Sequence, residues 1–391
     1  MAGTVMSSLS QQMLAIAVAW DLYLATKSPV VLGNVGLVQI IPVMVFALWA
    51  GHVADAYDRK RTASLGQLAY TLIGLVLAWN GVGNVPLIYG CLFVAGLART
   101  FQWPATSALL PQVVPPESLN RAVSWSASAR ELSTVGGPAL AGALLAALDS
   151  RAVYITYTVL AAVSLICFLS LAPQPVADRK ESATGWAGLM EGFRFVFSEK
   201  LVLYTMLLDL FAVLFGGAVA LLPIYANEIL HVGATGLGWL RAAPAFGAAC
   251  MGAYLAHRPP IRRAGPALLL AVVGFGIATI GFAVSKSAPL SFFLLFLTGA
   301  FDNISVVLRI FLVNAITPNR MLGRVSAVNS IFINSSNQWG AVESGYTAQW
   351  MGTAPSVVFG GSMTMLVVAV IAWLSPQLVK WRIQRDTDQS A

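Results

Sequence analysis

Residues 51–61 read GHVADAYDRKR, and they place two acids and three consecutive bases directly after a long apolar run. The chain around this stretch has 391 residues, of which 58% are hydrophobic and only 10% are charged. Soluble globular proteins carry far more charge than this. The composition therefore predicts a protein of the lipid bilayer, and it places GHVADAYDRKR in a loop at the membrane surface.

Apolar segments long enough to cross a bilayer follow one another along the whole chain. A helix needs about 20 apolar residues to cross a hydrocarbon core of roughly 30 Å. All spans should be helices, because lipid offers backbone polar groups no other way to pair. We predict an all-α membrane protein with about twelve transmembrane helices, near residues 4–26, 30–53, 63–81, 87–109, 121–147, 152–172, 201–225, 235–256, 266–285, 289–314, 324–350 and 354–376.

The basic residues gather in the loops on one side of the predicted membrane. That side holds Arg59, Lys60, Arg61, Arg258, Arg262, Arg263, Arg320, Lys380, Arg382 and Arg385, whereas the other holds little beyond Lys27, Arg151 and Lys286. Cytoplasmic loops carry such an excess of Lys and Arg. We therefore place both ends of the chain in the cytoplasm, with the protein in a bacterial cytoplasmic (inner) membrane. The net charge of +7 is interpreted as a topology signal and not as a nucleic-acid site.

One longer polar segment divides the spans into six and six. It predicts an N-terminal six-helix half (1–172), a cytoplasmic linker (173–200), a C-terminal six-helix half (201–377) and a cytoplasmic tail (378–391). In the linker, one face of a short amphipathic helix carries Trp186, Leu189, Phe193 and Phe197.

The two halves also resemble each other. An offset of about 203 residues aligns Gly33 with Gly236, Gly96 with Gly299, Pro115 with Pro318, Arg121 with Arg324 and Gly142 with Gly345. Two repeated halves are what alternating access requires, because one half moves against the other around a central site. An old gene duplication without transport is the alternative.

With the repeat established, GHVADAYDRKR resembles the loop between the second and third helices of the major facilitator superfamily, written G-x-x-x-D-x-x-G-R-K/R-K/R. Gly51, Asp55, Arg59, Lys60 and Arg61 match, and Asp58 replaces the second glycine. RTFQ at 99–102 is similar to the Arg-x-x-Gln of the fourth helix, with Trp103 in place of its glycine. GGPALAG at 136–142 is similar to the Gly-Pro motif of exporters.

Two longer stretches carry the resemblance further. LLPIYANEILHVGATGLGWLRAAPAFGA and TPNRMLGRVSAVNSIFINSSNQWG resemble the enterobactin-exporter and macrolide-efflux branch of the superfamily. The resemblance implies the two-half major facilitator fold and a transporter of a small molecule, and we expect a monomer. Gly136, Gly137 and Pro138 would let the fifth helix bend, which predicts a hinge, with simple close packing as the alternative.

The charged loop suits a gate that forms in one state and breaks in another. Our hypothesis is that Asp55 caps the eleventh helix, which should begin near Gly323, because a helix N-terminus stabilises an acid. Arg59 or Lys60 would pair with acids nearby, and Gly51 and Arg61 complete this cytoplasmic gate. A plain topology anchor is the alternative.

Nine charges fall inside the predicted spans, where each costs about 2.5–3.5 kcal/mol at a helix centre and usually faces protein or water. They are Asp21, Arg99, Arg130, Glu131, Asp209, Arg241, Asp302, Arg309 and Glu343. The acids are candidates for proton coupling, with Glu131 and Asp302 ranked first. Arg99 could hold an anionic substrate, and Gln102 completes the predicted cavity. Buried structural ion pairs are the alternative.

The sequence favours a secondary exporter that expels an amphipathic drug-like or siderophore-like molecule in exchange for protons, with sodium as the alternative ion. An importer or a lysophospholipid flippase on the same fold stays open, as does a non-transporting receptor or assembly factor. Catalysis finds little support, because His52, His231 and His257 are scattered and no metal or phosphate motif is present. We therefore predict no enzyme, no cofactor and no metal.

Overall fold

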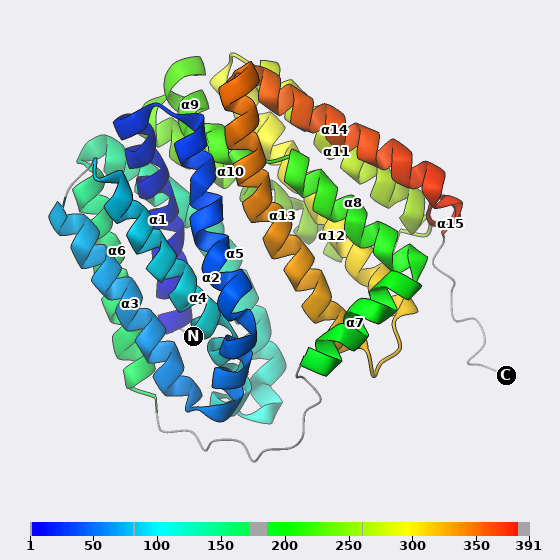
Figure 1. Ribbon diagram of the computed structural model, residues 1–391, viewed down its shortest axis with the longest axis horizontal. Coiled ribbons are helices and arrows are strands. Elements are labelled where there is room, and N and C mark those ends of the chain that lie inside the picture. Colours follow the sequence, from blue (N-terminus) through cyan, green and yellow to red (C-terminus); the bar gives the residue numbers. More distant parts are fainter. Residues whose placement is uncertain (1, 81–82, 172–185, 260, 382–391) are drawn as a thin grey trace. The chain divides into compact units, whose positions relative to one another are not determined.

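The structure is a computed structural model that describes residues 2–80, 83–171, 186–259 and 261–381 (Figure 1). For ten residues within these ranges only the backbone is described, namely Ala47, Leu48, Gly51, His52, Ala54, Asp55, Ala56, Pro116, Trp186 and Ala187.

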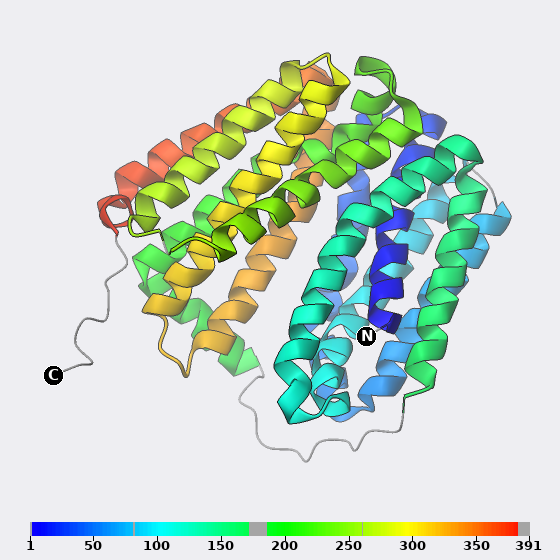
Figure 2. The same ribbon diagram turned by 180° about the vertical axis from the view of Figure 1, so that it is seen from behind.

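Six long helices build the N-terminal half. They are α1 (Ala2–Thr26), α2 (Pro29–Ala56), α3 (Arg59–Asn80), α4 (Val85–Val113), α5 (Leu119–Ala147) and α6 (Ser150–Leu169), with a short 3-10 helix η1 (Pro116–Ser118) before α5. Pro29 occupies the first turn of α2, where its missing N–H costs nothing. Figure 2 shows α1, in dark blue, between α5 and α6.

The C-terminal half begins with the amphipathic helix α7 (Trp186–Ser198) and then α8 (Lys200–Phe215). A broken segment follows, made of η2 (Ala218–Leu221), α9 (Leu222–Ile224) and the π-helix η3 (Tyr225–Ile229). The remaining helices are α10 (Gly233–Ala256), α11 (Ala264–Val284), α12 (Ala288–Ile316), α13 (Leu322–Met351), α14 (Thr353–Leu374) and α15 (Pro376–Lys380). The predicted all-helical class and the predicted spans are confirmed.

The long helices differ in how apolar their most hydrophobic stretch is. In the described part of the chain, 8 helical segments are long and apolar enough to cross a membrane by length and composition. The long helices α1, α5, α10 and α13 are not among these segments.

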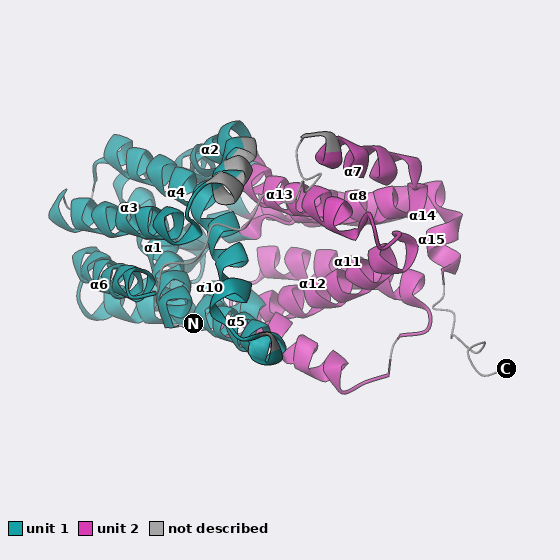
Figure 3. Ribbon diagram, turned by 90° about the horizontal axis from the view of Figure 1, so that it is seen from below, with its two compact units in different colours: residues 1–182, 219–245, 345–353 teal, residues 183–218, 246–344, 354–391 magenta. Residues whose placement is uncertain are grey.

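The described chain forms two compact units (Figure 3). Unit 1 comprises Met1–Ser182, Val219–Ala245 and Gly345–Thr353, and unit 2 comprises Ala183–Ala218, Phe246–Ser344 and Ala354–Ala391. Unit 1 thus contains the six N-terminal helices together with the ends of α10 and α13. The domain limits expected from the sequence stay predictions.

Equivalent helices pack in the same way in the two units. In unit 1, Gly3 of α1 lies on Cys167 of α6, and Gly74 of α3 lies on Tyr157 of α6. In unit 2, Gly360 of α14 lies on the backbone of Phe215 in α8, and glycines of α11 and α14 meet at Gly276 and Gly361. Small residues let membrane helices approach closely. The sequence repeat therefore corresponds to a repeat of helix pairs.

Helix α7 packs inside unit 2. Val196 is fully buried in an apolar cluster with Met321, Val325 and Val328, and Leu189 and Phe193 pack against this cluster. Glu191 forms an ion pair with Arg324 of α13. The predicted apolar face is correct for Leu189 and Phe193. Phe197 stacks on Phe193 and so lies on the same face of α7, although 59% of it is exposed, and Trp186 lies outside the described side chains.

Candidate functional site

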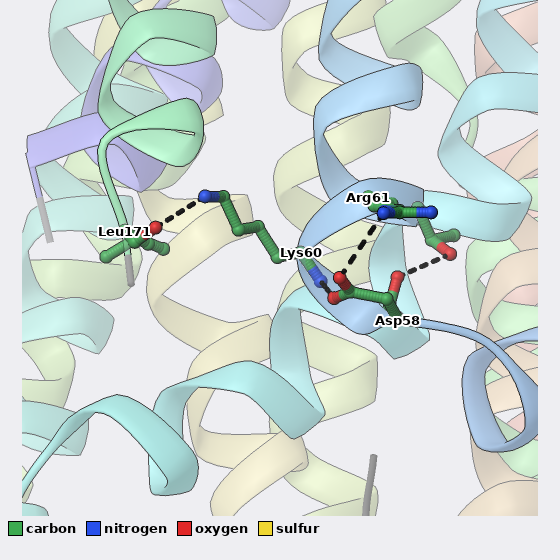
Figure 4. Close-up of polar contacts among 5 residues, drawn as sticks. Asp58, Lys60, Arg61 and Leu171 are labelled. Carbon is green, nitrogen blue, oxygen red and sulfur yellow. Dashed lines mark hydrogen bonds and ion pairs between the residues drawn. The ribbon is translucent and has the colours of Figure 1, made fainter. Parts of the chain in front are cut away.

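Asp58 caps the start of α3, directly after the loop that follows α2. Its Oδ1 accepts a hydrogen bond from the backbone N–H of Lys60 at 2.9 Å, and its Oδ2 lies 3.7 Å from Arg61 Nε (Figure 4). Asp58 therefore acts as the N-cap of α3. The backbone at Asp58 needs no positive φ, so the aspartate that replaces the motif glycine fits the turn.

The first two bases of this loop hold the ends of other helices. Lys60 Nζ donates to the carbonyl oxygen of Leu171, just after α6 (Figure 4), and Arg59 Nη1 donates to Ala108 O of α4 at 3.4 Å. Cations stabilise the carbonyl end of a helix. The predicted pairing of Arg59 or Lys60 with an acid stays a prediction, and the described contact of Lys60 is with the backbone. The side chain of Asp55 lies outside the described residues, and its capping of α13 stays a prediction.

Two of the nine charges predicted inside the spans neutralise each other in unit 2. Arg309 of α12 forms an ion pair with Asp209 of α8, and their side chains are 2% and 7% exposed. An arginine without an acid at this depth would be costly, and the pair removes most of this cost. Asp209 and Arg309 hold α8 and α12 together, and neither is open to a ligand in this arrangement.

Asp21 is also fully satisfied. It is 0% exposed and accepts hydrogen bonds from the hydroxyls of Ser150 and Tyr154, the latter at 2.6 Å. Both donors belong to α6, and Ser150 is the first residue of that helix, whose N-terminus favours an anion. Asp21 therefore joins α1 to α6.

Gln102 belongs to a buried network centred on a residue that the sequence analysis did not single out. Gln67 of α3 is 0% exposed, and its Oε1 accepts bonds from Ser7 and from Gln102, each at 2.9 Å. Gln67 Nε2 in turn donates to Ala161 O of α6 at 3.2 Å. The network links α1, α3, α4 and α6, so the Gln102 amide is used inside unit 1.

Five predicted residues stand apart because their charges are not neutralised. Arg99, Arg130 and Glu131 are exposed, and Arg241 and Asp302 are half-buried. In the described residues, none of these side chains has a hydrogen bond or an ion pair. Arg130 does lie over the ring of Trp103, with its Cζ atom 5.2 Å from the centroid. Glu343, in contrast, accepts a hydrogen bond from Ser344 at 3.4 Å.

A small hollow lies beside Arg130. It is lined by Thr4, Val5 and Ser8 of α1 and by Trp125, Ser126, Ala129 and Arg130 of α5, and its volume is about 20 Å³. Sites for drug-sized ligands occupy roughly 300–1,000 Å³. The hollow is therefore too small to hold a substrate by itself, although it brings a tryptophan and an arginine to the edge of one opening.

The predicted hinge residues lie inside one continuous helix, α5. A Cβ added at Gly137 would meet Gln12 of α1 at 2.6 Å, and one added at Gly238 of α10 would meet Pro138 O at 2.5 Å. Gly136 has nothing within 4 Å. Gly137 and Pro138 thus lie where α5 packs closely against two helices, and bending at this point stays a prediction.

The end of unit 1 opposite to the α2–α3 loop, called the far end below, is closed by polar and glycine contacts. Tyr23 Oη donates to Glu228 Oε1 at 2.7 Å and accepts from Asn227 Nδ2 at 3.0 Å, and both partners lie on the π-helix η3. Two glycine crossings flank this contact, one between Gly142 and Gly238 and one between Gly345 and Gly33. The sequence analysis missed these bonds.

Comparison with known proteins gives a family match and several relatives. The Major Facilitator Superfamily pattern matches residues 1–341. Macrolide efflux protein A of Streptococcus pyogenes is 29% identical over 185 residues, which cover 46% of this chain and 45% of that protein. The enterobactin exporter EntS of Citrobacter koseri is 27% identical over 390 residues, which cover 96% of this chain and 91% of that protein. The staphyloferrin A transporter of Staphylococcus aureus is 25% identical over 162 residues, 40% of each chain.

The aligned part therefore spans less than half of the macrolide and staphyloferrin proteins. Solved structures agree along nearly the whole chain. A nucleoside transporter, NupG, aligns with a TM-score of 0.74 at 13% identity and covers 95% of this chain and 98% of its own. A D-xylose–proton symporter aligns with a TM-score of 0.73 at 12% identity and covers 97% and 99%. At such identities the likeness shows the fold.

Proposed function

The chain belongs to the major facilitator superfamily, and we propose that it is a membrane transporter that exports an amphipathic small molecule in exchange for protons. The proposal places the protein in the bacterial cytoplasmic membrane with both ends in the cytoplasm, as the basic loops indicate. Export is favoured by the relatives, since two are named for efflux or export, and one of these aligns along 96% of this chain.

Proton coupling requires a carboxylate that can gain and lose a proton as its surroundings change. Asp21 and Asp209 are poor candidates because hydroxyl donors or an arginine already occupy their carboxylate oxygens. Asp302 and Glu131 have no such partner among the described residues, and Asp302 lies at the midpoint of α12. The open carboxyl of Asp302 is the observation that carries the proposal, with Glu131 as the second proton-binding candidate.

Alternating access also needs contacts that break when the transporter changes state. The bonds of Tyr23 with η3 and the two glycine crossings join N-terminal helices to segments of the C-terminal half, all within unit 1. We assign these contacts to the closed state of the far end.

The membrane potential can drive such transport. A potential of about 100 mV supplies roughly 2.3 kcal/mol per charge, enough for about a fifty-fold substrate gradient.

The test is a flux measurement in vesicles that hold a pH-sensitive dye. Macrolides, siderophores, cationic dyes and lysophospholipids are added in turn, with and without a sodium gradient. We expect at least one compound to drive proton movement in the wild type, and we expect Asp302→Asn to abolish it. Glu117→Gln, which removes an exposed acid from η1, is the matched control and should transport normally.

If transport depends on the sodium gradient and no protons move, the coupling ion in the proposal becomes sodium. Normal proton flux in Asp302→Asn and Glu131→Gln would remove both carboxyls from the proposal. Silence across the panel, with folded protein confirmed by its melting curve, would favour a protein that does not transport these compounds.

A further inference from the structure

Arg99, Trp103 and Arg130 form one group on unit 1, called the arginine–tryptophan site below. Arg99 and Trp103 lie four residues apart on α4 and therefore on the same face. Arg130 reaches over from α5 and covers the indole ring of Trp103 at 5.2 Å. The indole ring is thus in contact with one guanidinium group, with Arg99 one helical turn away on α4, and 56% of Trp103 remains exposed.

The depth of this site in the membrane makes the two arginines expensive. Arg99 is the middle residue of α4, which runs from Val85 to Val113, and Arg130 is close to the middle of α5. An arginine at such a depth costs about 2.5–3.5 kcal/mol on the insertion scale unless it faces protein, water or an anion.

The protein itself does not neutralise these charges. Neither side chain has an ion pair or a hydrogen bond in the part of the chain that the structure describes. The ring of Trp103 interacts with the face of the Arg130 guanidinium, which leaves its five N–H donors for another partner. Glu131 follows Arg130 directly, so it points about 100° away around the helix.

We propose that the arginine–tryptophan site selects substrates that are both aromatic and anionic. A flat ring would stack on the exposed indole, and its acidic group would accept paired hydrogen bonds from a guanidinium. A cationic substrate would be repelled by two positive charges. The inference rests on the proposed function, because it names the substrate class of that transport, and it is independent of the coupling ion and of the direction.

The test is equilibrium binding by calorimetry, with the full chain in lipid nanodiscs and no ion gradient. Three probes separate charge from ring: 2-naphthoate, cyclohexanecarboxylate and 2-naphthylmethylamine. We expect 2-naphthoate to bind at least about 10-fold more tightly than the amine, since a tenfold ratio needs only about 1.4 kcal/mol. Cyclohexanecarboxylate should bind more weakly than 2-naphthoate because it lacks the stacking ring.

Variants assign the binding to this site. Arg130→Gln should weaken both anions about 10-fold, whereas Trp103→Leu should weaken only 2-naphthoate. Arg130→Lys keeps the charge but loses the planar fork, and it should give an intermediate loss. Arg121→Gln, an exposed arginine in the first turn of α5, and Trp79→Leu, a tryptophan that is 88% exposed on α3, are matched controls that should bind like the wild type.

Tighter binding of the amine, or equal losses in Arg130→Gln and Arg121→Gln, would overturn the assignment. The binding experiment and the flux measurement can fail independently of each other. Selective binding of 2-naphthoate without proton movement would leave the arginine–tryptophan site in place and remove proton coupling. Proton-driven movement of cationic dyes with no binding of 2-naphthoate would do the reverse.

Discussion

The two units treat an arginine at mid-membrane depth in opposite ways. In unit 2, Arg309 is 2% exposed and is neutralised by Asp209 on the neighbouring helix. In unit 1, Arg130 is exposed, and its described contact is with the ring of Trp103. A buried pair holds two helices together and excludes a ligand, whereas an arginine without an acid leaves its donors for one. The difference separates residues that build the fold from residues that are available to a substrate.

Breaking the closed pair should have the largest effect. Arg309→Gln leaves Asp209 buried without its partner, which costs about 3–5 kcal/mol. We expect a large fall in the unfolding temperature in detergent, whereas Arg130→Gln should unfold close to the wild type. The double variant Asp209→Asn/Arg309→Gln should recover much of the loss, because no charge is then left unpaired. A stable Arg309→Gln would contradict the reading of this pair as structural.

Closing the open site should have the next largest effect. Trp103→Glu places a carboxylate beside Arg130 and makes unit 1 resemble unit 2. The new ion pair should compete with an anionic ligand, and we expect 2-naphthoate binding to fall about 10-fold, or about 1.4 kcal/mol. Trp103→Gln is the matched control, since it removes the ring without adding charge and should bind better than Trp103→Glu. Equal binding by the two variants would show that charge at Arg130 is not decisive.

A closed contact that must open during transport should respond more mildly. Tyr23→Phe removes the bonds to Glu228 and Asn227. Because Glu228 is exposed and Asn227 is half-buried, both can bond to water instead, and the net loss for the two bonds together should be about 0.5–1.5 kcal/mol. We expect the open population of the far end to rise by roughly 2- to 10-fold. Spin labels on Lys27→Cys and His231→Cys, in a background without the native cysteines, would measure it.

Tyr89→Phe is the control for that experiment. It loses a bond of 2.8 Å to Val31 O, but this bond joins α4 to α2 within the N-terminal helices. The distance distribution should therefore stay as in the wild type. Equal shifts in both variants would mean that the far end responds to any lost hydroxyl.

The smallest effects belong to the bases of the α2–α3 loop. Lys60→Met removes the bond to Leu171 O at the end of α6 and should cost about 0.3–1 kcal/mol of stability. Arg61→Gln affects a side chain that is 86% exposed, with a loose contact of 3.7 Å to Asp58, and should change stability by about 0.5 kcal/mol or less. Denaturant melts of the two variants would test the order. A larger loss of stability in Arg61→Gln than in Lys60→Met would contradict our view that Lys60 stabilises the fold more than Arg61 does.

The helices could be predicted because their length and apolarity are local properties of the chain, and the charges inside the spans were visible for the same reason. Their partners were not. Asp209 and Arg309 are 100 residues apart in sequence, so their pairing appears only when α8 and α12 are packed. Arg59 or Lys60 was expected to pair with an acid, but Lys60 donates to the carbonyl oxygen of Leu171. A hydrogen bond to the backbone cannot be predicted from the pattern of side chains. Tyr23 donates to Glu228, which lies on the π-helix η3, and no sequence motif predicted that helix.

The two glycine crossings at the far end bear on the symmetry of the fold. Gly345 of α13 lies on Gly33 of α2, and Gly142 of α5 lies on Gly238 of α10. Under the 203-residue offset, α5 corresponds to α13 and α2 corresponds to α10. Exchanging each helix for its equivalent in the other half therefore turns one crossing into the other. A homodimer with twofold symmetry makes every contact twice in this reciprocal way. The crossings therefore have the reciprocal form of the interface in a twofold dimer, with the two six-helix halves in the place of the two subunits.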